Sequence, residues 1–109
     1  MYARVARFEG VEPGAMDAQI AEIEQSMAAA AAGQLPEGAP AEVQTLVESI
    51  VRYVQLVDRG SGTAYGIAFC ESDDDAKRVH DALDAMSPST GEGKRTAAGI
   101  FEVAVDQSF

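Results

Sequence analysis

The residue types that define several familiar protein classes are scarce or missing in this chain. Its 109 residues include one cysteine, one histidine, no tryptophan and eight basic residues. A single thiol, Cys70, excludes an internal disulfide and a cysteine-rich zinc site, and it is typical of the reducing cytoplasm. No run approaches the ~20 apolar residues of a membrane-spanning helix. We therefore expect a cytoplasmic protein without a disulfide framework.

Positive charge is also in short supply. Eight basic residues against 18 acidic ones give a formal net charge of −10. This charge repels phosphate backbones and anionic lipid, so we expect neither a nucleic-acid partner nor a membrane partner. An acidic surface can also serve solubility alone, and that interpretation competes with recognition of a cationic ligand. The alternating start, Met1–Phe8, lacks the basic and then apolar blocks of a signal peptide.

The first half of the chain predicts a strand and two helices. The length and a hydrophobic content of 47% suit a single domain with one modest core. Residues Tyr2–Val11 alternate as a strand does, and apolar residues at helical spacing across Ala15–Ala32 predict a helix that Gly33 ends. Two prolines and a glycine predict a loop over Gln34–Pro40, after which Val43–Ile50 returns to helical spacing.

The second half predicts two strands, a helix and a last strand. Val51–Asp58 and Thr63–Glu71 are rich in β-branched and aromatic residues and flank a glycine-rich turn, which indicates a hairpin. Ser72 and the acidic residues after it predict a helix start, and Ser87-Pro88 predicts its end. A loop over Ser89–Ala98 and a strand over Gly99–Asp106 complete the pattern. This order predicts an α+β, ferredoxin-like βαββαβ antiparallel sheet with helices on one face.

The hairpin is apolar on both of its faces. One face carries the bulkier side chains, namely Arg52, Val54, Leu56, Tyr65, Ile67 and Phe69. The other carries smaller ones, namely Val51, Tyr53, Gln55, Val57, Ala64, Gly66, Ala68 and Cys70. A sheet with one wet face should alternate apolar and polar residues. We expect the helices to cover the bulky face, and a second copy of the chain to cover the small-residue face in a symmetric homodimer.

The segment Leu56–Ser72 is a hairpin that ends in an aromatic residue, an acid and a serine, namely Phe69, Glu71 and Ser72, before an acidic helix start. In this segment the chain resembles the dimeric α+β barrel superfamily, which includes antibiotic-biosynthesis monooxygenases. The resemblance implies two sheets packed into a barrel across a two-fold axis. It also implies a ligand pocket inside the barrel or between the sheet and its own helices. The family often has tryptophan where this chain has Cys70, so the resemblance does not extend to haem-degrading chemistry.

Six residues are candidates for a pocket. Tyr53, Gln55 and Cys70 share the small-residue face, where neighbouring alanines and glycine leave space for a small apolar ligand. The competing interpretation is that the partner fills this space. For Cys70, nearby carboxylates disfavour the thiolate, so a structural thiol competes with a nucleophile.

The other candidates come from different elements. His80 lies at the margin of a helix stripe and cannot alone form a multi-histidine metal site, but it could serve as an acid or base. Arg4 and Glu102 are expected on neighbouring strands, either as an ion pair or as groups that orient a ligand. The run Asp73–Asp75 lacks calcium-loop spacing and indicates helix initiation. We predict no metal and no cofactor.

The sequence leaves two functions open. One is a small-molecule enzyme or binding protein with a cofactor-free, monooxygenase-like pocket formed by the sheet. The other is a non-enzymatic dimeric module whose apolar face serves association alone. The first predicts a pocket of about 300 Å³ or more with converging polar groups, and the second predicts a filled interior.

Overall fold

A computed structural model describes residues 1–34, 41–86 and 94–109 of the chain. Its elements in chain order are β1 (Tyr2–Glu9), α1 (Pro13–Ala31), α2 (Ala41–Ser49), β2 (Arg52–Asp58), β3 (Thr63–Cys70), α3 (Asp73–Met86) and β4 (Lys94–Glu102). The four strands form one antiparallel sheet in the order β2-β3-β1-β4. The predicted α+β class and antiparallel sheet are confirmed, and the strand order is compatible with a ferredoxin-like fold.

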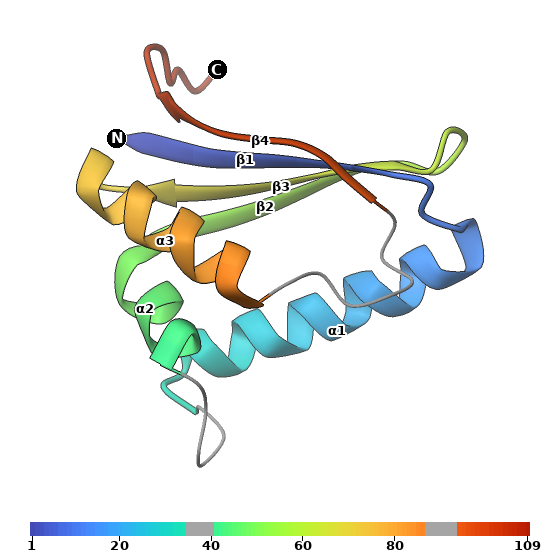
Figure 1. Ribbon diagram of the computed structural model, residues 1–109, viewed down its shortest axis with the longest axis horizontal. Helices are drawn as coiled ribbons and strands as arrows, with labels where there is room; N and C mark the ends of the chain where they lie inside the picture. Colours follow the sequence, from blue (N-terminus) through green and yellow to red (C-terminus); the bar gives the residue numbers. More distant parts are fainter. Residues whose placement is uncertain (35–40, 87–93) are drawn as a thin grey trace.

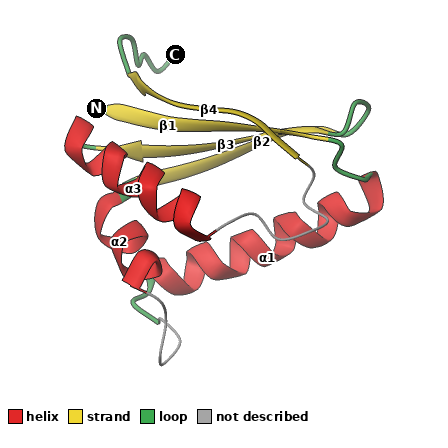
Figure 2. Ribbon diagram, in the orientation of Figure 1, coloured by secondary structure: helices red, strands yellow, loops and turns green. Residues whose placement is uncertain are grey.

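The three helices lie on the same side of the sheet (Figure 1). Helix α3 runs along the sheet, and α1 lies farther from it. Helix α2 lies near the C-terminal end of α1 and contacts α3. In Figure 2 the helices form one layer and the strands the other, and past β4 the C-terminal segment turns to the opposite side of the sheet. No helix of the described ranges is long and apolar enough to cross a membrane.

Two local signals act as the sequence predicts. Ser72 caps α3, because its side-chain hydroxyl accepts a hydrogen bond of 3.1 Å from the backbone N–H of Asp75. Gly33 adopts a positive φ of 74° just after α1 and donates its N–H to the carbonyl of Ala30. Glycine reaches this left-handed conformation without a steric penalty, so it ends the helix there.

The last strand differs from its prediction. It begins at Lys94 and ends at Glu102, whereas a loop was predicted up to Ala98 and a strand over Gly99–Asp106. Pairing with β1 extends it toward its start, because Glu9 lies opposite Lys94, and the ladder accommodates a register shift next to Phe8. The predicted loop Gln34–Pro40 and the predicted helix stop at Ser87-Pro88 lie outside the described residues, apart from Gln34.

The prediction of which sheet face the helices cover is wrong. Ala68 and Cys70 of the small-residue face are fully buried against Ala76 and Val79 of α3. The bulky side chains point away from the helices, and Leu56 there is 51% exposed. Small side chains let a helix approach the sheet closely, so close packing outweighs the preference for placing the largest apolar residues beneath it.

The turn between β2 and β3 provides a test of the fold. Gly62 has a φ of 72°, and a Cβ added there would lie 2.6 Å from the carbonyl oxygen of Val11. We expect Gly62→Ala to lower the free energy of unfolding by about 2–4 kcal/mol, from the left-handed backbone and the clash together. Gly60→Ala is the matched control, with a change of at most about 0.5 kcal/mol, because its Cβ would make only an ordinary contact with Asp58. Urea unfolding measures both, and equal midpoints for the two variants would contradict this account of the turn.

Candidate functional site

The sheet face beneath the helices is lined mainly by small side chains. Strand pairing places residues of all four strands in rows across this face. The middle row consists of Gln55, Gly66, Ala6 and Ala98. The rows on either side contain Tyr53, Ala68, Arg4 and Ile100, and Val57, Ala64, Phe8 and Arg95. Glycine and alanine in the centre leave space that the larger side chains at the edges enclose.

A cavity of about 150 Å³ occupies part of this space. It lies between the sheet and α1, and it is lined by Phe8, Gln19, Ile23, Tyr53, Gln55, Ala64, Tyr65 and Gly66. Helix α1 encloses it incompletely, because Met16 is buried whereas Ile23 is only half-buried and Met27 is exposed. The cavity is smaller than the pocket of about 300 Å³ that we expect of a small-molecule site.

Tyr53 has a defined place at this cavity. A Cβ added to Gly66 would lie 2.7 Å from the Tyr53 hydroxyl oxygen, so the ring reaches diagonally across the sheet to a position of β3 that has no side chain. Glycine inside a strand often marks such a close approach. The absence of a side chain at Gly66 therefore gives the phenol its position.

A charged cluster lies on the same sheet face, beneath α3, and Arg4 is its one buried member among the described residues. Arg4 is 5% exposed, and its Nε donates a long hydrogen bond of 3.4 Å to Nδ1 of His80. His80 Nε2 lies 3.3 Å from Asp84 Oδ2, and Asp84 Oδ1 lies 3.9 Å from Arg4 Nη2. Arg95 of β4 also hydrogen-bonds Asp84. The bond from Arg4 makes Nδ1 an acceptor, which in a neutral imidazole leaves the proton on Nε2, facing Asp84.

The charges of this cluster are not balanced. Among the described residues two arginines face a single carboxylate, so with a neutral imidazole one positive charge remains within this set. Burial lowers the pKa of Arg4 from its ordinary value, and the nearby positive charge of Arg95 lowers it further. The hydrogen bond from Arg95 lowers the pKa of Asp84, which keeps that carboxylate ionised. Tyr53, which lines the cavity, also lies near Arg4, so the cluster and the cavity are neighbours on this face.

The structure brings four of the six predicted site residues into these two neighbouring places. Tyr53 and Gln55 line the cavity, and Arg4 and His80 are hydrogen-bonded to each other. Because the small-residue face lies beneath the chain's own helices, the cavity forms there and not in a dimer interface. Cys70 lies instead in the hydrophobic core, where burial raises the pKa of its thiol and Asp75 raises it further.

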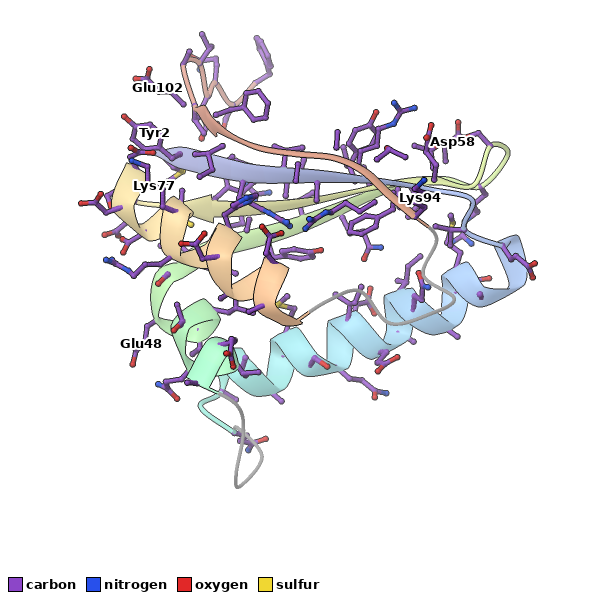
Figure 3. The ribbon with its side chains drawn as sticks, viewed as in Figure 1. Tyr2, Glu48, Asp58, Lys77, Lys94 and Glu102 are labelled. Carbon is purple, nitrogen blue, oxygen red and sulfur yellow. The ribbon has the colours of Figure 1, made fainter. Side chains whose placement is uncertain are left out.

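Glu102 lies outside the site. It is exposed at the end of β4, and Figure 3 shows it at the edge of the sheet near Tyr2. β1 and β4 are neighbours, as predicted, but Glu102 lies opposite Tyr2 while Arg4 lies opposite Ile100. Arg4 and Glu102 form no ion pair in the described structure, because the carboxylate nearest Arg4 is that of Asp84 on α3.

Several residues of the site were missed in the sequence. Asp84 lies four residues after His80, a spacing that places both side chains on one helix face, so it could have been found. Gly66 is an isolated glycine in a strand, which is also a readable signal. Arg95 falls in a segment predicted to be a loop. Gln19 belongs to a helix whose distance from the sheet no sequence pattern gives.

The chemistry available at the cavity favours binding over proton transfer. Among its lining residues are the amides of Gln19 and Gln55 and the phenol of Tyr53, and none of the lining side chains is a carboxylate, an imidazole or a thiol. Amide and phenol groups orient a ligand through hydrogen bonds. No group of three or more histidine, cysteine or acidic residues suited to a metal ion occurs in the described ranges.

Comparison with protein-family models, curated proteins and solved structures found no match to this chain.

The position of Tyr53 can be tested with a double-mutant cycle. We expect Gly66→Ala to lower the free energy of unfolding by about 1–3 kcal/mol, because the new methyl group displaces the phenol. In a Tyr53→Phe background the same change should cost about 1 kcal/mol less, because the clashing oxygen is absent. Chemical denaturation of the four proteins measures this coupling. Strictly additive effects would show that the hydroxyl does not occupy the space above Gly66.

Proposed function

We propose that this chain is a homodimeric small-molecule-binding domain whose ligand lies between the sheet and α1. The observation that carries the proposal is the cavity over Gly66, where Tyr53, Gln55 and Gln19 supply polar groups beside an apolar lining. Sites of this character, apolar with a few placed polar groups, are typical of small-molecule recognition. The resemblance to the dimeric α+β barrel superfamily is compatible with this location, because it implies a pocket either between the sheet and its own helices or inside the barrel.

The proposed dimer forms through the sheet face opposite the helices, which we name the open face. Its apolar side chains are Val5, Val54, Leu56, Tyr65, Ile67, Phe69 and Phe101. Leu56 and Phe101 are 51% and 59% exposed, which is unfavourable for a face left in water.

Charge makes a second copy of the chain a suitable partner for this face. The rows that contain Val54 and Leu56 hold no carboxylate, although the chain as a whole carries a net charge of −10. The carboxylates on this face, Glu9 and Asp58, stand at one end of the sheet, and the face also carries the arginines Arg7 and Arg52. Two copies can therefore meet through opposite charges, and a two-fold axis gives both the same contacts.

A dimeric module without a ligand is the second candidate function. The size of the cavity favours it, because about 150 Å³ is half of the lower end of typical ligand sites. In this case the open face serves association, and the small space beneath the helices has no occupant. Ligand binding separates the two candidates, whereas dimer formation is common to both.

The cavity can be tested with benzyl alcohol, a small ring with one polar group. We expect it to shift the amide NMR signals of Gly66 and Gln19 at millimolar concentration, because an apolar cavity of about 150 Å³ can hold a six-membered ring. Ile23→Trp should abolish the shifts by filling the space from α1. Ala21→Trp, on an exposed position of the same helix, should leave them intact. Uniform small shifts over the whole surface, or none, would favour the module without a ligand.

Association can be tested by sedimentation at micromolar concentration. We expect twice the subunit mass of 11.4 kDa. Leu56→Glu should weaken association by about tenfold or more, because it places two buried charges at the centre of the interface. Met27→Glu adds the same charge at an exposed position of α1 and should leave the dimer unchanged. A compact wild-type monomer would refute the proposed dimer.

A further inference from the structure

We propose that the ligand of this cavity is a small cyclic amide, and that the side-chain amide of Gln55 binds it. The inference rests on the proposed function and adds the chemical class of the ligand. It begins from the polar groups that line the cavity, because they determine which hydrogen bonds a ligand can form there.

Gln55 is the lining residue whose polar group is available to a ligand. Within the described part of the chain its amide has no hydrogen-bond partner, whereas Gln19 and Tyr53 each already interact with another group of the protein. In the same ranges the buried polar side-chain atom without a partner is Arg7 Nε, so the amide of Gln55 is not sealed inside the core. Gln55 is half-buried and lines the cavity, and a ligand there can therefore reach its amide.

The lining favours a neutral ligand. None of the lining residues is an acid, a histidine, a lysine or an arginine. An ion that left water for such a cavity would lose its hydration without gaining a counter-charge, which is costly. A polar but uncharged group loses only hydrogen bonds, and an amide of the protein can replace these.

The chemistry of Gln55 then selects the polar group of the ligand. A primary amide presents a carbonyl oxygen, which accepts a hydrogen bond, beside an N–H, which donates one. A ligand pairs with both groups when its own N–H and C=O lie side by side. Open-chain secondary amides are almost always trans, which places these two groups on opposite sides of the bond.

A small ring meets this requirement and also fits the space. The ring closes the amide in the cis form, so that N–H and C=O point to the same side. The cavity of about 150 Å³ holds a body about the size of one six-membered ring. A six-membered lactam therefore matches the cavity in charge, in hydrogen bonding and in volume.

The lactam δ-valerolactam and the ketone cyclohexanone provide the test. Both are six-membered rings with one carbonyl group, and the lactam alone has the adjacent N–H. Affinity is followed by NMR titration of the Gly66 and Gln19 backbone amide signals. We expect the wild-type protein to bind the lactam about threefold to tenfold more tightly, as for one additional hydrogen bond. Gln55→Met should remove this preference, whereas Gln44→Met, which removes an amide from an exposed position of α2, should retain it.

A second variant keeps the test decisive if Gln55→Met does not fold. Gln55→Thr introduces a residue type that is enriched in strands, so β2 should still form. The threonine side chain has no amide and is too short to replace it. We expect the same loss of the preference for the lactam.

Three outcomes would overturn the inference. Equal affinity for the lactam and cyclohexanone, or binding of benzyl alcohol without the lactam, would refute it while leaving the proposed binding function intact. A preference that persists in both Gln55 variants would assign the recognition of the lactam to another residue. Failure of all three compounds to bind would remove the proposed function together with the inference.

Discussion

The structure depends on one constraint, which is that the sheet face beneath the helices is built from small residues. Ala68 and Cys70 allow Val79 of α3 to pack directly against β3. Dense packing of this kind contributes to stability through many small contacts and through the removal of apolar surface from water. The same constraint sends the bulky side chains of the hairpin to the other face, because neighbouring residues of a strand alternate. The cavity beneath the helices and the apolar open face are thus two consequences of one pattern.

Small residues also explain why polar groups can lie beneath the helices. Ala6 and Gly66 occupy little volume, and the space above Gly66 admits the phenol of Tyr53. A buried charge is costly unless it is paired and hydrogen-bonded, and removal of its partner costs more than the pair contributes. His80 and Asp84 supply Arg4 with a hydrogen-bond acceptor and a nearby carboxylate. The sheet face beneath the helices therefore combines a layer of alanines with a charged group.

Much of the fold could be predicted from the sequence, because its signals are local. The alternation in the hairpin, the hydroxyl cap at Ser72 and the glycine after α1 each act within a few residues, and the structure confirms them. The start of β4 could not be predicted in this way. Its first residues are held by pairing with β1, more than 80 residues away, and the sequence around Lys94 is as polar as a loop.

The sequence predicts several residues of the candidate site, but it does not predict how they are arranged in space. Alternation shows that Tyr53 and Gln55 share a face, but it does not show which face the helices cover. Side-chain size alone predicts the larger residues on the helix side, whereas close approach of α3 requires the smaller ones. The contacts among Arg4, His80 and Asp84 join the first strand to the last helix, and such long-range contacts depend on strand order and on the position of α3. Their residue types are visible in the sequence, but their proximity is not.

The most direct test of which sheet face the helices cover is the set of proton–proton NOEs from the Val79 methyl groups of α3. The account predicts strong NOEs to the Ala68 methyl group and the Cys70 side chain, and none to Ile67 or Phe69 on the open face. NOEs from Val79 to Ile67 and Phe69 would show that the helices cover the other face. They would contradict both the cavity over Gly66 and the proposed mode of association.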